Sequence, residues 1–440
     1  MSHETDHGRH RKRFHLKIRH VILGVFAALL VAGILHVAVL SSGANRRVEA
    51  LRAAGQPTSL AELAVRNKLP MGMENAASFY QSAIGMFVPP PADANIPFAG
   101  KKTVTLARGS GIPESMAEAV AEFLAANEKC LALLHEAAGI ENCRYDYDYQ
   151  KEMPPFTELR GCAQLLKLAV VNHAQKGDVA AAVSCIKDLL RLSDSLRDEP
   201  RLISYFVQSA YAGLAIRSLE RALSLTTFTD SQLRELDDAL AVTAGRIDLA
   251  RALALERCAV IDCIRDPSLV EPSKIGIVIF KLPGVQSQGL IDMLDHLGDC
   301  IQAAGLQGPK RETRFKEIEA RLSGLSHLHI AAKIMAPPLA RTSQLDSRVH
   351  AHLDLGRTAV AVERHRLAKG KLPDQLADLV PAYMEQIPID PFDGQPIRYR
   401  RTEPGYVLWS VMEDGQDNGG KDREDVGRGE PYDLCFIVAK

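Results

Sequence analysis

Apolar and polar positions repeat at helical spacing over most of the chain. Between residues 113 and 139, for example, Met116, Val120, Phe123 and Leu124 recur mainly three or four residues apart, which places them near one face of a helix. Close to the C-terminus the pattern changes to short runs typical of strands, at Ile397–Arg400, Tyr406–Val411 and Leu434–Val438. The sequence therefore predicts a mainly α protein with a few antiparallel strands at its C-terminal end.

Turn and capping residues divide the helical region into separate elements. The sequence Lys176-Gly177-Asp178 interrupts the apolar pattern between 159 and 196, and it supplies a C-cap glycine and an N-cap aspartate for a helical hairpin. Thr229 and Gln232 fit a capping box that opens a helix predicted to continue to about Arg265. A further long amphipathic helix is predicted from 341 to 369, and the small C-terminal strands follow it.

The longest apolar run lies near the N-terminus. Residues 21–40 read VILGVFAALLVAGILHVAVL, with His36 as the only strongly polar residue. A helix of this length spans roughly 30 Å, the hydrocarbon thickness of a bilayer, so we predict a transmembrane helix in contact with the lipid bilayer. The preceding residues 1–20 are rich in Arg and Lys, which the positive-inside rule places in the cytoplasm.

These patterns predict four parts: a basic cytoplasmic tail (1–20), a transmembrane helix (21–40), a helical extracytoplasmic domain (41–340) and a small α+β domain (341–440). Two alternatives to the membrane anchor are a signal peptide cleaved near Ser42-Gly43-Ala44 and a buried helix of a soluble protein. A second apolar run, Ile275–Leu282, is too short to cross a bilayer.

Composition narrows the classes of function. The formal net charge is −1, so the chain lacks the basic excess that binds nucleic acid, and we expect no nucleic-acid partner. Eight cysteines occur without any CxxC pair, which argues against zinc and thioredoxin-like sites. Most of these cysteines are expected to be small apolar residues of the core.

Histidines and carboxylates in the helical region give only weak indications of chemistry. His327 with His329, and His350 with His352, are spaced so that each pair points apart on a helix, whereas His350 and Asp354 lie one helical turn apart. Hydrolase, P-loop and dinucleotide-binding motifs do not occur. One enzyme hypothesis places a site in the helical domain at the residues Glu256, Arg257 and Asp262.

The loop between Met412 and Asp433 contains eight carboxylates, and Gly415, Gly419 and Gly420 allow its backbone to curl. Calcium binds six to eight oxygen ligands in loops of this kind, so the sequence predicts a calcium site. Its side-chain ligands are predicted to be Asp414, Asp417, Asp422 and Asp425. A solvated acidic surface loop is the alternative.

The segment LADLVPAYMEQIPIDPFDGQPIRYR, followed by GYVLWSVMEDGQDNGGKDREDV, resembles the C-terminal domain of the type II secretion major pseudopilin. The resemblance covers about Leu355 to Asp433 and implies a pseudopilin-like α+β domain, a calcium-binding loop and a bacterial inner-membrane location. The chain departs from that family near its N-terminus. The apolar helix lies over 300 residues upstream, and Gly24 is followed by Val25, with Leu29 where a glutamate would stand.

Taken together, the sequence predicts a single-pass membrane protein of the bacterial inner membrane, with a cytoplasmic N-terminus and the bulk of the chain outside. A structural or interaction role is expected, with an envelope protein as partner and calcium stabilising the C-terminal loop. The alternatives are an enzyme with its site in the helical domain and a component of a type II secretion-like system.

Overall fold

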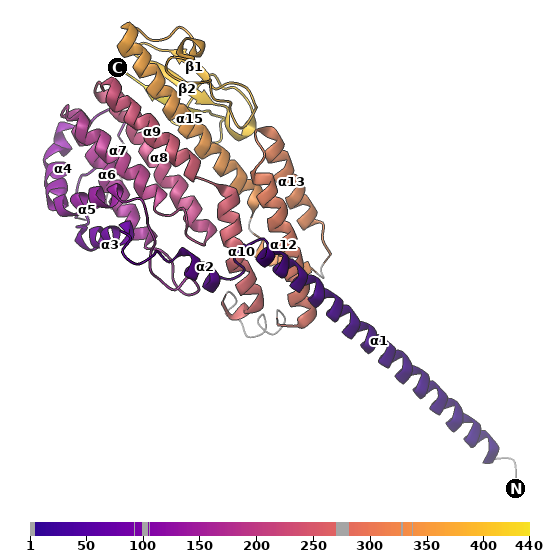
Figure 1. The fold of residues 1–440 in the computed structure, drawn as a ribbon. Coiled ribbons are helices and arrows are strands. Elements are labelled where there is room, and N and C mark those ends of the chain that lie inside the picture. Colours follow the sequence, from indigo (N-terminus) through magenta and orange to yellow (C-terminus); the bar gives the residue numbers. More distant parts are fainter. Residues whose placement is uncertain are drawn as a thin grey trace. The chain divides into compact units, whose positions relative to one another are not determined.

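The computed structural model describes residues 5–91, 93–98, 104, 106–269, 281–326, 329–336 and 338–440. It is mainly helical, with one small antiparallel sheet near the C-terminus, as predicted (Figure 1). The first helices are α1 (Thr5–Ala53), α2 (Leu60–Asn67), α3 (Ala76–Met86), α4 (Glu114–Ala126), α5 (Glu128–Gly139), α6 (Phe156–Gln175) and α7 (Val179–Asp194). They are followed by α8 (Leu202–Leu225), α9 (Asp230–Arg246), α10 (Leu249–Arg265), α12 (Pro283–Ala304), α13 (Pro309–Ser323), α14 (Ile330–Met335) and α15 (Leu339–Lys369).

The chain divides into two compact units, and each is made of several segments. The smaller unit comprises Met1–Thr58, Val260–His296 and Leu322–Ala336. The larger unit comprises Ser59–Ala259, Leu297–Arg321 and Pro337–Lys440. Residues 341–440, predicted as a domain of their own, thus belong to the same compact unit as the helices between Ser59 and Ala259.

In the smaller unit, the C-terminal part of α1 packs against the first turns of α12. The Arg47 guanidinium donates to both carboxylate oxygens of Asp295, at 2.7 and 2.8 Å. The hydroxyls of Ser41 and Ser287 are 3.0 Å apart. Ala44 and Val48 are buried on the same face of α1. The end of the long helix is therefore fixed in a folded environment.

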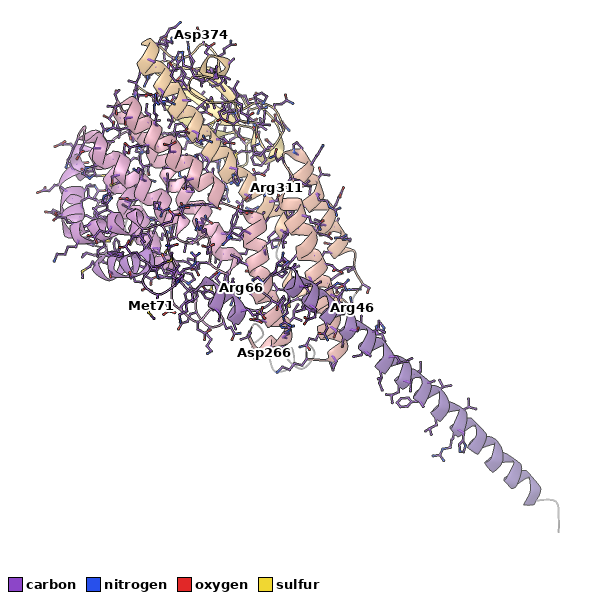
Figure 2. All side chains as sticks on the ribbon, in the orientation of Figure 1. Arg46, Arg66, Met71, Asp266, Arg311 and Asp374 are labelled. Carbon is purple, nitrogen blue, oxygen red and sulfur yellow. The ribbon has the colours of Figure 1, made fainter. Side chains whose placement is uncertain are left out.

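The preceding part of α1 has no such environment. Most of its large apolar side chains between Val21 and Val39 are more than half exposed, and none of the most apolar window is buried. Figure 2 draws the side chains along this helix. Among the residues that the structure describes, this is the one helix long and apolar enough to cross a membrane. The apolar run Ile275–Leu282 lies almost entirely outside the described residues.

The larger unit is built on a layer of long helices. In Figure 1, α6, α7 and α8 lie side by side, and α15 lies against α8 and α9. The predicted hairpin is present as α6 and α7, with Gly177 at φ +76° and the Asp178 carboxylate accepting from the amide of Ala181 at 3.2 Å. The capping box of Thr229 and Gln232 also forms at the start of α9.

Two helices predicted as continuous are divided in the structure. The segment 113–139 breaks at Asn127, whose buried carboxamide accepts from the amide of Val88 at 2.8 Å and donates to its carbonyl at 3.0 Å. The helix predicted to reach Arg265 breaks at Ile247, where the backbone is extended. Asp248 then accepts from the amide of Arg251 at 3.1 Å and opens α10. In both cases a polar side chain ends or begins a helix that apolar periodicity alone would continue.

The sheet contains β1 (Arg398–Arg401), β2 (Tyr406–Ser410) and β3 (Leu434–Val438), in the order β1-β2-β3 with both pairs antiparallel. These strands match the predicted ones to within one residue. The sheet packs on α15 and α8, and the Glu220 carboxylate of α8 accepts from the amide of Ile437 at 2.7 Å. This contact explains why the C-terminal segment is part of the larger unit.

Asp390 holds the turn before the sheet in place. One carboxylate oxygen accepts from the amide of Phe392 at 3.0 Å and from the Ser410 hydroxyl at 2.9 Å. The other accepts from the amide of Val411 at 2.9 Å and from Arg398 at 2.8 Å. The Asp390 side chain is fully buried, so these donors replace all of its water.

Candidate functional site

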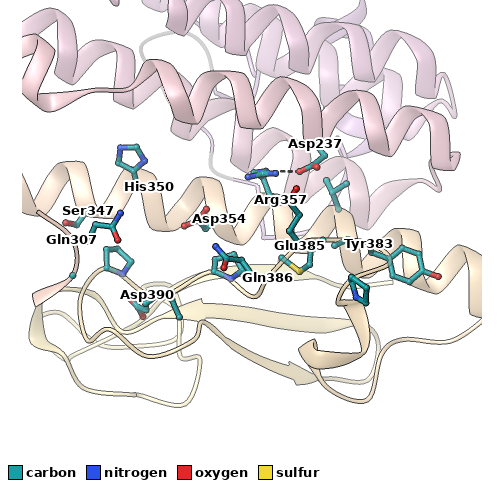
Figure 3. Close-up of a pocket in the computed structure, with 18 of the residues that line it drawn as sticks. Asp237, Gln307, Ser347, His350, Asp354, Arg357, Tyr383, Glu385, Gln386 and Asp390 are labelled. Atoms are coloured by element: carbon teal, nitrogen blue, oxygen red, sulfur yellow. Dashed lines mark hydrogen bonds and ion pairs between the residues drawn. The ribbon is translucent and has the colours of Figure 1, made fainter. Parts of the chain in front are cut away.

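A large cavity opens in the larger unit beside α15. Its volume is about 880 Å³. One wall is α15, another is the connection from α12 to α13 (residues 304–308), and a third is the segment Pro381–Pro391 (Figure 3). Because its walls come from parts of the chain that are far apart in sequence, only the folded unit forms this space.

Asp354 and His350 lie one turn apart on α15 and both line the cavity. The Asp354 carboxylate makes no hydrogen bond or ion pair within the part of the chain that the structure describes. Burial raises the pKa of Asp354 to about 6, although His350 and Arg357 act in the opposite direction. A carboxyl group with such a pKa can hold or release a proton near neutral pH.

His350 is linked to a second, deeper carboxylate. Its Nε2 lies 3.7 Å from the Asp346 carboxylate. Asp346 is almost fully buried, accepts a hydrogen bond from the Tyr205 hydroxyl and forms an ion pair with Arg311. Asp346 is therefore satisfied by fixed donors, and His350 is positioned between it and the open cavity.

The cationic side chains of the cavity wall are paired. Arg357 donates to Asp237 at 2.8 Å, and this contact raises the pKa of Arg357 (Figure 3). Arg364 donates to Asp230 at 2.8 Å and lies over the ring of Tyr383. These pairs fix the wall of the cavity, whereas Asp354 remains available to a ligand.

The opposite wall adds polar groups. Tyr383, Glu385 and Gln386 all line the cavity from the segment between α15 and the sheet. The site thus combines a carboxyl group, an imidazole and an amide around one space. Such a set can bind a polar molecule that carries both hydrogen-bond donors and acceptors, and Asp354 with His350 can transfer protons to or from it.

The histidines considered as metal ligands do not come together. His329 pairs with Asp292 at 2.6 Å in the smaller unit, whereas His350 and His352 belong to α15 in the larger unit. His352 is buried and lines a different cavity from His350. His327 lies outside the described residues. Among the side chains that the structure describes, no group of three or more His, Cys, Asp or Glu is arranged to hold a metal ion.

Each of the four predicted calcium ligands binds donors within the protein. Asp417 accepts from the Trp409 indole at 2.8 Å and from the amide of Gly419 at 2.9 Å. Asp422 pairs with Arg108 at 2.6 Å. Asp414 accepts from the amide of Gln416 at 3.1 Å, and Asp425 from that of Asp422 at 2.9 Å. Each of these carboxylates has a protein donor of its own in the structure, and calcium binding by the loop stays a prediction.

The residues of the enzyme hypothesis, Glu256, Arg257 and Asp262, line neither this cavity nor the second one described below. Glu256 accepts from the amide of Leu202 at 2.7 Å, at the first turn of α8. Its position indicates a capping role for that helix. Arg257 and Asp262 are buried.

Sequence reasoning placed His350 and Asp354 one helical turn apart and did not predict the cavity. The spacing of His350 and Asp354 was the available signal, because i,i+4 positions share a helix face. Asp237 and the segment Pro381–Pro391 carried no signal, since each reaches the cavity only through packing of α9 and of the loop against α15. Comparison with protein-family models, curated proteins and solved structures finds no match for this chain. The pseudopilin resemblance accordingly stays a prediction.

Proposed function

We propose that the chain is a single-pass membrane-anchored protein with an interaction role, in which the larger unit binds a polar small molecule in the cavity beside α15. The observation that carries the anchor is the exposure of the apolar side chains from Val21 to Val39, next to a helix end that is folded. Exposed apolar surface of this extent is stable in lipid and unfavourable in water.

The contacts of α1 also support retention of the helix over its removal. The alternative cleavage site, Ser42-Gly43-Ala44, lies inside α1, and Ala44 is buried. Ser41 and Arg47, on either side of it, contact α12. A bacterial inner-membrane location with an envelope protein as partner belongs to the same proposal and is supported by the basic residues of the N-terminal tail.

Extraction of membranes tests the anchor. The full chain is expected to remain in the pellet after alkaline carbonate treatment and to dissolve only in detergent. A variant lacking residues 21–40 is expected in the soluble fraction. Release of the full chain by carbonate, or an N-terminus beginning near Asn45 in the purified protein, would contradict the anchor.

An acid–base enzyme is a second candidate, favoured by the position of Asp354 and His350 one helical turn apart on the wall of an open cavity. Asp354 would take or give a proton, and His350 would hold the charge that develops nearby. A panel of chromogenic esters, phosphates and glycosides tests this candidate. Turnover that is lost in Asp354→Asn and in His350→Asn, and retained in the exposed control Asp238→Asn, is expected. Absence of turnover over the panel, or equal turnover in all variants, would argue against it.

A further inference from the structure

A second cavity, of about 490 Å³, lies in the larger unit away from Asp354. Its walls are α6, α8 and α15 together with the loop before β3. Cationic side chains reach it from three of these elements, among them Lys167 on α6, Arg217 and Arg221 on α8 and Arg348 on α15. Some of these positive charges are neutralised by carboxylates of the protein, and others are not.

Several of the cations have partners. Arg108 lies between two carboxylates, Glu220 and Asp422, at 2.6 Å from each. Arg348 pairs with Glu413. Arg221 donates to the carbonyl of Ala107 at 2.8 Å. A backbone carbonyl satisfies the hydrogen bond of the guanidinium but does not neutralise its positive charge. Of the four carboxylates among the described residues that line the cavity, Glu220 and Asp422 pair with Arg108, and Asp433 accepts from backbone amides. Glu424 is the fourth.

Lys167 and Arg217 have no hydrogen bond or ion pair with any residue that the structure describes. The ammonium of Lys167 lies 3.8 Å from the centre of the Phe98 ring, and the guanidinium of Arg221 lies 5.5 Å from the same centre. Phe98 is buried and its backbone is in the left-handed region at φ +66°, which is costly for a phenylalanine. The ring therefore gathers two cations at one side of the cavity.

This arrangement is electrostatically unfavourable when no anion is present. Burial and the charges of Arg217 and Arg221 together lower the pKa of Lys167 to about 8. Burial also lowers the pKa of Arg217, although Glu220 acts in the opposite direction. His352 faces the same charges and its pKa is lowered to about 3, so it is neutral and adds no positive charge. Burial lowers the pKa of Arg221, although Glu220 and Glu424 act in the opposite direction.

We propose that this cavity binds an oxyanion, a phosphate or carboxylate group held between Lys167 and Arg217, with the remainder of the ligand against Phe98 and Leu106. Guanidinium and ammonium groups are the usual partners of such anions, and their hydrogen bonds to a charged acceptor are strong. The anion would neutralise the positive charges of Lys167 and Arg217, which form no ion pair within the described residues. A membrane-anchored protein meets two sources of this chemistry, a free phosphorylated metabolite and a phospholipid headgroup.

Thermal unfolding of the full chain in an uncharged detergent tests the proposal, with inorganic phosphate as the probe and sodium chloride at equal ionic strength as the reference. A saturable rise in Tm with phosphate is expected. Lys167→Gln and Arg217→Gln should each weaken the apparent affinity at least tenfold. The matched controls Lys129→Gln and Arg160→Gln, both exposed and outside the cavity, should respond as the wild type does.

Two further measurements keep the test decisive. If the cavity variants do not fold, acetylation of wild-type Lys167 followed by mass spectrometry gives the answer, because phosphate should slow that reaction severalfold and leave Lys129 unaffected. Asp354→Asn should leave the phosphate response intact, so failure of the proposed function and failure of this inference are distinguishable. No saturable rise in Tm over chloride, or the same rise in both cavity variants, would overturn the inference.

Nanodiscs separate the two sources of the anion. If a lipid headgroup is bound, phosphatidylglycerol discs should raise Tm over phosphatidylcholine discs and abolish the response to added phosphate. If a free metabolite is bound, both discs should give the same Tm and the same response to phosphate. Absence of any phosphate response in phosphatidylcholine, together with equal Tm in the two discs, would count against the proposal.

Discussion

Asp354 keeps its proton to a higher pH than an ordinary aspartate, since burial raises its pKa from 3.8 to about 6. Between these two values the folded chain binds more protons at this site than the unfolded chain does. The free energy of unfolding therefore falls as pH rises through this window. Above pH 6 the whole of this loss of stability is present. The cost arises from a carboxylate that is partly desolvated and has no donor facing it.

The first prediction follows from that window. Asp354→Asn removes the charge, so between pH 4 and pH 7 the wild type should lose about 1–2 kcal/mol of unfolding free energy relative to the variant. This value is reduced to allow for solvent in the open cavity. Urea denaturation at several pH values measures it, with Asp238→Asn as the exposed control. A difference that does not change with pH would contradict the role assigned to burial.

A second prediction concerns Asp390. Asp390→Asn should destabilise the larger unit by about 3 kcal/mol, because the buried carboxylate accepts from four donors and the NH₂ group of asparagine cannot accept on one side. Arg398 would keep Asp393 as an ion-pair partner. Asp374→Asn, which removes the exposed partner of Arg401, should cost less than about 1 kcal/mol. Urea midpoints of the two variants give the comparison, and equal losses would show that Asp390 does not hold the turn.

The turn between β1 and β2 requires glycine at position 405. Gly405 has φ +98°, and a Cβ atom placed on it would lie 1.8 Å from the carbonyl oxygen of Val438. An L-residue is therefore excluded by its backbone angle and by its neighbour. Gly245, near the end of α9, has no atom within 4 Å of the corresponding position. The two glycines form a matched pair for substitution.

The third prediction uses that pair. Gly405→Ala should destabilise the larger unit by more than about 2 kcal/mol, since β3 must move away from the turn. Gly245→Ala should stabilise it by about 0.5–1 kcal/mol, because alanine loses less entropy in a helix. Thermal melts measure both changes. A stable Gly405→Ala variant would show that the turn adopts another conformation.

At the level of single elements, residues with local signals were predicted well. The hairpin at Lys176-Gly177-Asp178, the capping box at Thr229 and all three strands appear in the structure. The breaks at Asn127 and Ile247 were not predicted. Asn127 gives no local sign that its side chain is buried and bonded to Val88, and the apolar Ile247 continues the repeat although its backbone is extended. For the loop of Asp414, Asp417, Asp422 and Asp425, the sequence did not show that local amides, Trp409 and Arg108 would contact these carboxylates, and calcium binding there stays a prediction.

Over the whole molecule, the sequence predicted the long apolar N-terminal helix and the mainly helical fold, and it missed the packing between distant segments. Nothing in the local pattern around Lys167 shows that it lacks a partner, because that depends on Arg108 taking both Glu220 and Asp422. The same holds for the assignment of residues 341–440 to the larger unit. Long-range contacts decide both points, and a periodic pattern contains no information about them.

The fourth prediction addresses orientation. Met71 is fully exposed, so Met71→Cys should react with a membrane-impermeant maleimide in intact spheroplasts, whereas Ser2→Cys should react only after lysis. Labelling is compared with that of the wild type, in which most cysteines are buried. The opposite pattern would place the bulk of the chain in the cytoplasm.

The contact between β3 and α8 has a consequence for biosynthesis. Glu220 and Arg108 bind the backbone of Ile437 and Cys435, at sequence separations of 217 and 327 residues. Lys440 further donates to the carbonyl of Thr226 at 2.8 Å. Helices made early therefore lack these contacts until a strand made more than 200 residues later has been synthesised and has folded against them. A chain that stalls just before residue 434 would leave the part of α8 that contacts β3 uncovered and become a substrate for quality-control proteases.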